Sequence, residues 1–253
     1  MTDVTERSEV ERLLQDPAYA VPEADAASTR AAARLRANAS RFANGATHDE
    51  RRLRIDALLA GLDADRLASD ARSRTRALRS AGATVDEIAE RVPVAVLADA
   101  LGFDDPDAAP EAAAVLATTY PTGEPSTTAD AAAARLLDAA GPRDAALRAQ
   151  LLVQAHAATA GLIMGALGSP AADVADSPTA DLLATTLRDD PPVRQTRRVG
   201  PDGGVVTLRL DGPDQGSPRA PRTLAFGAGP RACPTRAHAL AIAAAVVDEV
   251  RAC

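Results

Sequence analysis

The sequence lacks lysine and tryptophan altogether, and aromatic residues make up only 2% of its 253 positions. Its basic side chains are therefore all arginines, and the formal net charge is -7 at pH 7. An acidic chain with so few aromatic rings offers little to a phosphate backbone or to stacked bases, so no nucleic-acid partner is expected. The hydrophobic share of 46% is enough for a core in one domain or two small ones. The frequent alanine favours packed helices over a β-sandwich.

Cysteine is scarce as well, since the chain has only Cys233 and Cys253. Two cysteines make no disulfide framework, and no charged-then-apolar leader opens the sequence. The longest apolar stretches, at 151–167 and 237–250, are interrupted by polar or charged side chains, so neither is expected to span a membrane. These features predict a cytoplasmic protein with no membrane partner.

The organisation predicted along the chain is mostly helical. Residues 1–16 are polar and are expected to form a flexible N-terminal segment, ahead of a single domain over 17–253. Prolines keep residues 17–28 extended, and a helix is predicted over about 29–38.

Three longer helices are predicted from capping signals and apolar spacing. Those over 47–62 and 84–103 open with Ser/Thr-x-x-Glu capping boxes, and the third, over 144–170, is apolar nearly all round. The capping pairs are Thr47 with Glu50 and Thr84 with Glu87. The third helix is expected to be the central axis of the core. After a further helix that ends near Arg188, residues 195–210 predict two short strands about a glycine-rich turn, and 211–222 are expected to be irregular.

The stretch "LAFGAGPRACPTRAHALAIAAAVVDEV", residues 224–250, places a cysteine between a glycine-rich loop and an apolar helix. Gly227 and Gly229 would let the backbone lie close against a flat ligand. Cys233 is expected at the N-cap of the last helix, with Pro234 in its first turn. The positive end of that helix would favour a thiolate over a thiol.

Several interpretations of Cys233 are open from these residues alone. A thiolate at a helix N-terminus suits either a nucleophile or a soft ligand to iron, and a buried structural thiol is the third interpretation. Zinc is not expected, because no second cysteine stands at C-x-x-C spacing.

The segment "FGAGPRAC" also resembles the heme-ligand loop of the cytochrome P450 superfamily, F-x-x-G-x-x-x-C, with Phe226, Gly229 and Cys233 on its key positions. The resemblance implies a mainly α, compact, cytochrome P450-like helical fold with a small residual β element. It implies that Cys233 is the thiolate ligand to the iron of heme b, with Gly227 in the same cofactor-binding loop.

Four other stretches resemble the family in the same order along the chain. "HDERR" places His48 and Arg52 four residues apart on one helix face, where the resemblance implies that they bind one heme propionate. "RDDPPVRQTRRV", residues 188–199, resembles a family segment that runs from a helix into a strand, where Arg198 falls on a propionate-binding arginine. Arg231, in the cysteine loop itself, falls on the other basic propionate position. Residues 151–167 resemble the central distal helix of the family, and 85–103 resemble an earlier helix with its following turn.

The departures from the family pattern concern proton delivery and the surroundings of the heme. The acid and alcohol that relay protons in the family fall on Ala157 and Ala158, which leaves Thr159 and His156 as candidate catalytic residues of the distal pocket. The glutamate that normally pairs with Arg188 is replaced by Thr185. The sequence is also shorter than ordinary members of the family, which predicts an abridged substrate cover.

A further departure follows the cysteine itself. Pro234 removes an amide that would otherwise donate toward the sulfur, so a more electron-rich thiolate is expected.

The resemblance implies a heme-dependent oxidoreductase of the monooxygenase type, acting on a small molecule such as a secondary metabolite. The oxidant would be oxygen, with electrons from a ferredoxin-type redox partner, or peroxide. Because the proton relay is missing, peroxide-driven or dehydratase-like heme chemistry is a competing interpretation. The alternative is a non-catalytic heme-binding protein, or a degenerate relative, that serves as a partner or sensor.

Overall fold

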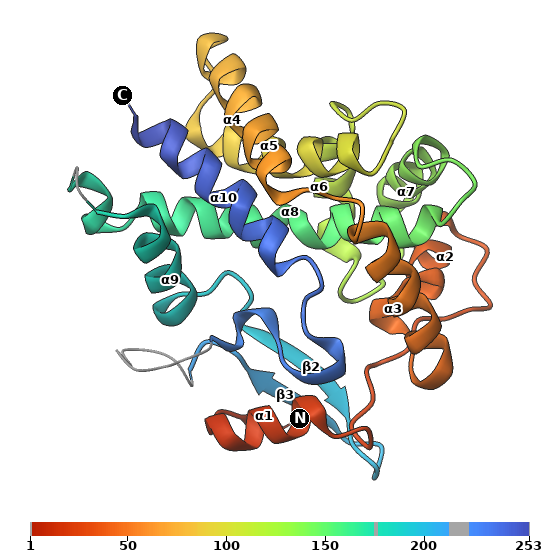
Figure 1. Cartoon of the computed structure of the whole chain (residues 1–253). Coiled ribbons are helices and arrows are strands. Elements are labelled where there is room, and N and C mark those ends of the chain that lie inside the picture. The colour runs from red at the N-terminus through yellow and green to blue at the C-terminus, as the bar shows by residue number, and fades with distance from the viewer. Residues whose placement is uncertain (1, 175–176, 213–222, 253) are drawn as a thin grey trace.

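The computed structural model describes residues 2–174, 177–212 and 223–252. Over these ranges the chain forms ten α-helices, four short 3-10 turns and one small three-stranded sheet. Figure 1 shows the helices gathered in one body, with the sheet and helix α1 at one end of it. The predicted mainly α fold with a small β element is confirmed.

Helix α8 is the central element of the helical body (Figure 1). It spans Ala145–Leu167 and packs most extensively against four other helices. They are α5 (Val85–Ala100), α6 (Ala109–Thr119), α9 (Thr179–Asp189) and α10 (Arg236–Arg251). By length and composition α8 could cross a membrane, yet half of its most apolar window is buried inside the fold, as in the core helix of a folded protein. The predicted central axis is confirmed.

The remaining helices surround this core and differ in part from the sequence expectations. They are α2 (Ala31–Asn38), α3 (Gly45–Leu59), α4 (Ala64–Ser80) and α7 (Thr127–Ala139).

The capping box that opens α5 is confirmed, because the Glu87 N–H donates to Thr84 Oγ1 at 3.2 Å and the Thr84 N–H donates to Glu87 Oε2 at 2.7 Å.

The capping box predicted at Thr47 is wrong, because α3 begins two residues earlier, at Gly45. Its N-cap, Asn44, has no capping side-chain bond and instead holds the chain at Val21. The Val21 N–H donates to Asn44 Oδ1 at 2.9 Å, and Asn44 Nδ2 donates to the Val21 carbonyl at 3.0 Å. A contact across 23 residues of chain therefore fixes the start of this helix, which local capping rules do not anticipate.

The sheet consists of the predicted hairpin and one unpredicted strand. Strands β2 (Gln195–Val199) and β3 (Val205–Arg209) pair antiparallel, as expected. The additional strand is β1 (Thr2–Val4), which runs parallel to β3 with Thr2 opposite Val206. Residues 213–222, part of the segment predicted to be irregular, lie outside the described residues.

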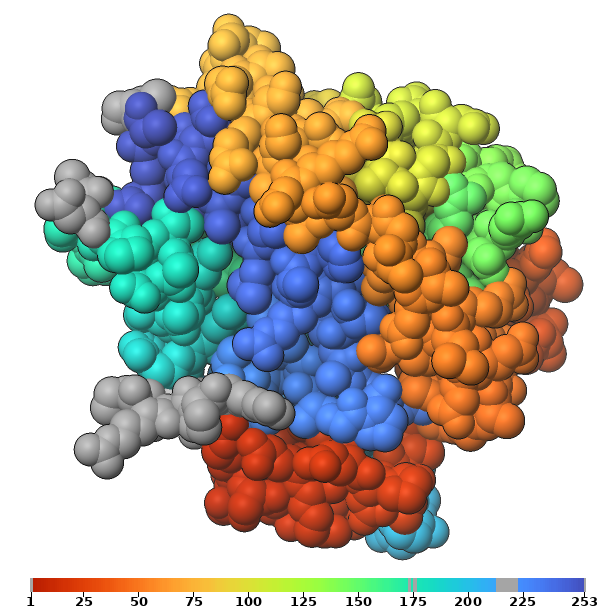
Figure 2. Space-filling model, in the orientation of Figure 1, coloured from red at the N-terminus to blue at the C-terminus, as the bar shows by residue number. Residues whose placement is uncertain are grey.

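Residues 2–16, part of the segment that the sequence predicts to be flexible, form a strand and a helix in this structure. After β1, helix α1 (Arg7–Gln15) buries Val10, Leu13 and Leu14 in a second small core. Leucines of the sheet and of the loop before α10 complete that core, so apolar burial offsets the ordering cost of a polar-looking segment. In Figure 2 this N-terminal segment (red) lies directly against the C-terminal part of the chain (blue).

Candidate cofactor and active site

A cavity of about 390 Å³ lies among α8, α3, β2 and the loop that precedes α10. A volume of this order suits a cofactor or a small molecule. The cavity wall includes every site residue predicted from the sequence except Gly229 and His156. The predicted residues on the wall are His48, Arg52, Thr159, Arg198, Phe226, Gly227, Arg231 and Cys233.

Gly229 belongs to the loop before α10 but does not line the cavity. Its φ is +67°, and a Cβ at this position would stand 2.8 Å from the Cγ of Gln15 and 3.3 Å from the Leu14 carbonyl oxygen. A glycine is thus required because α1 packs closely against the loop. The motif glycine that the sequence assigned to cofactor binding is a packing residue in this structure.

His156 of α8 is half-buried and is not on the cavity wall. Its Nδ1 has no hydrogen-bond partner among the described residues. Burial lowers the pKa of this imidazole, and the charge of Glu90 on α5 opposes that shift only in part. The ring is therefore expected to be neutral at pH 7 and does not stand where it could act on a molecule in the cavity.

The loop that carries Cys233 is held in a tight curve by backbone hydrogen bonds. The Cys233 N–H donates to the Phe226 carbonyl at 2.8 Å, and the Gly227 N–H donates to the Leu224 carbonyl at 2.7 Å. Gly227 has a φ of +67°, which L side chains rarely adopt. Cys233 itself is half-buried and lies on the cavity wall.

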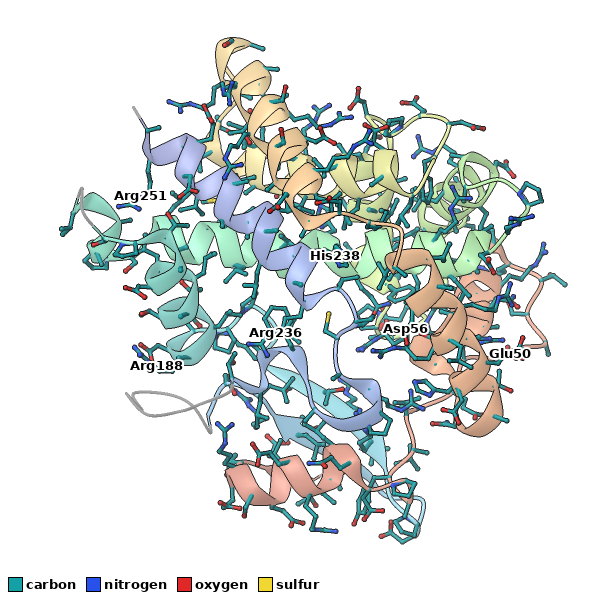
Figure 3. All side chains as sticks on the ribbon, in the orientation of Figure 1. Glu50, Asp56, Arg188, Arg236, His238 and Arg251 are labelled. Carbon is teal, nitrogen blue, oxygen red and sulfur yellow. The ribbon has the colours of Figure 1, made fainter. Side chains whose placement is uncertain are left out.

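Cys233 is not the N-cap of the last helix. The chain turns through Pro234 and Thr235, Thr235 is the N-cap, and α10 begins at Arg236. The sulfur therefore lies ahead of the helix N-terminus by two more residues than the sequence predicts. Figure 3 labels Arg236 at this end of α10 and Arg251 at the other.

The Thr235 side chain lies next to the Cys233 sulfur, to which Pro234 has no N–H to donate. Thr235 makes no capping bond to the backbone of α10, although threonine commonly caps helices. Its Oγ1 instead lies 3.3 Å from Cys233 Sγ, within hydrogen-bond range for sulfur. A thiolate can only accept, so in that form of Cys233 the Thr235 hydroxyl would be the donor and would make the sulfur less electron-rich than expected from Pro234 alone.

Arg198 on β2 is the most deeply buried cation on the wall, with 4% of its surface exposed. Its Nη1 donates to Thr196 Oγ1 at 3.1 Å and to the Arg197 carbonyl at 2.9 Å. Burial, together with the nearby charges of Arg231 and Arg41, lowers the pKa of its guanidinium to about 10. It still carries its charge at pH 7, without a carboxylate partner among the described residues.

The other basic residues of the predicted set surround the same cavity. Arg52 Nη1 donates to the Ala232 carbonyl at 2.8 Å, which ties α3 to the residue before Cys233. Arg231 Nη2 donates to the Ala43 carbonyl at 2.7 Å, and burial lowers the pKa of this guanidinium. His48 is buried, with its Nδ1 at 3.0 Å from Asp49 Oδ1.

The cavity wall has no carboxylate of its own among the described residues. Arg52 forms an ion pair with Asp56 on the exposed side of α3, outside that wall. Buried cations without anionic partners are costly, so this arrangement favours an anionic guest that would compensate them. Carboxylate groups of a bound molecule would fit this donor set.

Helix α8, whose residues 151–167 resemble the distal helix of the family, forms one wall of the cavity. Ala157, Ala158 and Thr159 all line the cavity, and only Thr159 among these three has a group that can hold a proton. Beside them, Gln150 is 3% exposed and is fixed by Ser40, whose N–H donates to Gln150 Oε1 at 2.6 Å. The structure thus places α8 and the Cys233 loop on the same cavity.

Arg188 keeps a partner despite the threonine at position 185. Its Nε and Nη2 donate to the two carboxylate oxygens of Asp189 at 2.7 and 2.6 Å. The end of α9, where Figure 3 labels Arg188, is tied to the loop before Cys233 by Thr223 Oγ1, which donates to the Leu187 carbonyl at 2.9 Å. A threonine hydroxyl therefore makes a contact between α9 and the cysteine loop.

Sequence reasoning missed three residues of the site: Arg41, Tyr120 and Thr235. Tyr120 had a signal, because tyrosine occurs only twice in this chain. Thr235 also had one, since it stands two residues after the candidate ligand. Arg41 is one of many arginines and has no sequence signal that separates it from the others.

No protein-family model and no curated protein matches the sequence. Solved structures do match the fold. One is P450BioI in complex with hexadec-9Z-enoic acid ligated acyl carrier protein, at 17% identity, covering 98% of this chain and 83% of that chain, with a TM-score of 0.76. Another is the thermophilic cytochrome P450 from Sulfolobus tokodaii, at 18% identity, covering 98% and 86%, with a TM-score of 0.72.

A third similar structure is the cytochrome P450 enzyme CxnD for C–S bond formation in chuangxinmycin biosynthesis. It is 16% identical, the match covers 97% of this chain and 78% of that chain, and the TM-score is 0.75. Identities this low establish architecture rather than activity. Together with the order of the elements around the cavity, they show that this chain has the cytochrome P450 fold.

Proposed function

We propose that this protein is a heme-thiolate oxidoreductase that acts on a small molecule, with Cys233 as the ligand to the iron of heme b. The observation that carries the proposal is the single cavity between the Cys233 loop and α8, lined by basic side chains and by no described carboxylate. Heme is flat and carries two propionates, and this is the kind of guest that the donor set fits.

His48, Arg52, Arg198 and Arg231 would hold the propionates through charge-assisted hydrogen bonds. Phe226 and Gly227 would lie against the ring, with Gly227 allowing close approach of the backbone. When bound, heme supplies an iron centre whose oxidising chemistry the protein tunes through the thiolate and its hydrogen bonds. Thr235 would donate to the sulfur, and the wall formed by α8 would orient the substrate.

Proton supply sets the type of chemistry in this proposal. Ala157 and Ala158 have no proton donor, His156 lies off the cavity wall, and Thr159 is the remaining hydroxyl of this stretch. Oxygen with electrons from a ferredoxin-type partner needs protons delivered in step, whereas hydrogen peroxide brings its protons with its oxygen atoms. We therefore favour peroxide as the oxidant over oxygen with an electron donor.

The basic residues His48, Arg52, Arg198 and Arg231 lead to the first prediction, which concerns heme retention. Replacing Arg198 and Arg231 together by alanine is expected to weaken heme binding about 10²-fold or more, because each bond to a charged group contributes about 1.5–3 kcal/mol. The heme dissociation constant, measured by transfer to excess apomyoglobin, checks it. Arg66→Ala is the control, because the Arg66 side chain is 84% exposed and away from the cavity. Unchanged retention in the double variant would show that these residues do not hold the propionates.

The second prediction concerns the Thr235 hydroxyl. In heme-free protein with Cys253→Ser, replacing Thr235 by valine is expected to slow alkylation of Cys233 by iodoacetamide about tenfold at pH 7.5, because the thiolate loses a donor. Thr235→Ser should retain most of the wild-type rate. The same valine substitution should lower the reduction potential of the heme-loaded protein. Equal alkylation rates in the valine and serine variants would mean that the hydroxyl does not act on the sulfur.

The alternative function is a non-catalytic heme-binding protein that serves as a partner or sensor. The observation that favours it is the pair of alanines on α8, since a sensor needs no proton relay. The two functions differ in whether the bound heme can take up an added ligand and support product formation. Binding of added imidazole or cyanide together with peroxide-dependent product formation supports an enzyme, whereas a heme that excludes both ligands and forms no product supports the sensor.

A further inference from the structure

Helix α8 presents to the cavity one side-chain amide that has no role in the proposed heme site. Gln154 is exposed and lines the cavity. Its Nε2 donates to the carbonyl of Gln150, one turn earlier on the same helix, at 3.3 Å. Among the described residues, Gln154 Oε1 has no hydrogen-bond partner. The amide thus keeps its acceptor oxygen and its second N–H for a molecule in the cavity.

The other polar side chains with which α8 lines the cavity are less available. Gln150 is 3% exposed, and Ser40 binds both ends of its amide. The Ser40 N–H donates to Gln150 Oε1 at 2.6 Å, and Gln150 Nε2 donates to Ser40 Oγ at 2.9 Å. Thr159 is buried, with 4% of its surface exposed. Gln154 is therefore the exposed polar residue on this wall of the cavity.

Gln154 also stands next to the positions on which the proton relay of the family falls. Ala157 and Ala158 follow it by three and four residues, so the three residues are neighbours on one face of α8, and all of them line the cavity. Side chains on a helix lean toward its N-terminus, which directs the two alanine methyl groups toward the turn of Gln154. The small alanines therefore leave space beside the amide, in the cavity that Cys233 also lines.

An amide in this place can hold a small polar molecule, although it cannot supply a proton. Its N–H groups donate and its oxygen accepts, and neither ionises near pH 7. Hydrogen peroxide has two O–H donors and two acceptor oxygens, so one amide can both donate to it and accept from it. Dioxygen has no hydrogen to donate and would leave the amide oxygen unpaired. This complementarity favours peroxide over dioxygen beside Gln154.

We propose that Gln154 binds the oxidant, hydrogen peroxide, on the α8 side of the cavity. Its Nε2 donates to one peroxide oxygen, and its Oε1 accepts from an O–H of the peroxide. This inference rests on the proposed function, because it assumes a bound heme that uses peroxide. Gln154 then orients the oxidant, and Ala157 and Ala158 leave room for it.

The experiment compares Gln154→Leu with the wild type, both loaded with heme, in the epoxidation of styrene driven by hydrogen peroxide. Leucine is similar in size and has no hydrogen-bonding group, so the KM for peroxide should rise about 5- to 50-fold, as expected for the loss of two neutral hydrogen bonds. The KM for styrene should change less than about twofold, because styrene has no group that bonds to the amide. Gln195→Leu is the matched control and should change neither KM, since Gln195 is an exposed glutamine of the same cavity wall that lies on β2.

A second readout does not depend on turnover. In the reduced carbon monoxide complex, an N–H that donates to the carbon monoxide oxygen polarises the C–O bond and lowers its stretching frequency in the infrared. Gln154→Leu should therefore raise this frequency, and Gln195→Leu should leave it unchanged. Heme content is measured on every variant, so that a failure of the heme proposal shows separately as a protein without heme.

If Gln154→Leu contains heme and keeps the wild-type peroxide KM and C–O frequency, the inference is overturned while the heme site stands. A rise in the styrene KM alone also overturns it, because the amide would then bind the substrate. If the ferric Soret band moves in Gln154→Leu and added cyanide binds more tightly, Gln154 is itself a ligand to the iron, which overturns the inference and favours the sensor. A heme-loaded wild type that forms no epoxide with peroxide overturns both the preference for peroxide and this inference.

Discussion

Replacing Cys233 by alanine is expected to abolish the strongly red-shifted Soret band of the reduced carbon monoxide complex while much of the heme stays bound. The reason is that the thiolate alone produces this shift, whereas retention depends also on the basic residues on α3, β2 and the cysteine loop. The measurement is the optical spectrum of the reduced protein with carbon monoxide, together with the heme content per chain.

The matched control for this variant is Cys253→Ala, which removes the only other cysteine of the sequence and should leave the spectrum unchanged. Cys233→Ser tests whether an oxygen at the same place can substitute for sulfur, and we expect that the shifted band is lost there too. A full-strength shifted band in Cys233→Ala would mean that another group binds the iron.

Restoring an acid and an alcohol on α8 is expected to have the second large effect. The double substitution Ala157→Glu with Ala158→Thr should raise oxygen-driven product formation about 10²-fold or more, because a positioned proton donor typically contributes 10²–10⁴-fold. Ala157 and Ala158 both line the cavity, so the new side chains have space there. Styrene serves as the probe, and its epoxide is measured with a ferredoxin electron supply and, separately, with hydrogen peroxide.

The matched control is Ala157→Gln with Ala158→Thr, which has nearly the same size without the acid. It should remain close to the wild type with oxygen, and the peroxide-driven rate should change little in either variant. Efficient, well-coupled oxygen-driven turnover by the unmodified protein would show that Thr159, an ordered water or the substrate delivers the protons. The preference for peroxide would then be wrong.

Much of the fold follows from patterns that act locally. The capping box of Thr84 and Glu87 fixes the start of α5, and the all-round apolar sequence of 145–167 places α8 in the core. The hairpin over 195–209 follows from short apolar segments about a glycine-rich turn. In each case one segment contains the signal, so the sequence is sufficient to predict it.

The rest depends on contacts between distant segments. Helix α1 had a local signal, because Val10, Leu13 and Leu14 are spaced to share one helix face, and the polar residues around them hid it. The partners of that face are the sheet and the loop before α10, which the sequence does not reveal. Asn44 opens α3 because it binds Val21 rather than because of a capping box. Helices α4, α6 and α7 were not predicted. The spacing of apolar residues is weak in α6, whereas α4 has an apolar face and an Asp63 N-cap that are visible in the sequence.

The candidate site shows the same division. His48, Arg52 and Cys233 could be selected from motif spacing, and the structure brings them to one cavity. Motif spacing does not report which side a helix or loop residue faces, and for this reason Gly229 and His156 were placed at the cavity although neither lines it. Arg41 lines the cavity too, although no spacing or motif in the sequence separates it from the other arginines.

The most direct test of the heme-thiolate assignment is the spectrum of the purified wild-type protein, reduced and exposed to carbon monoxide, with its heme content determined in parallel. The account predicts about one heme per chain and a strongly red-shifted Soret band, as expected for a thiolate ligand supplied by Cys233. A protein that takes up no heme, or a bound heme whose carbon monoxide complex absorbs at the unshifted position of a histidine-ligated one, would contradict it.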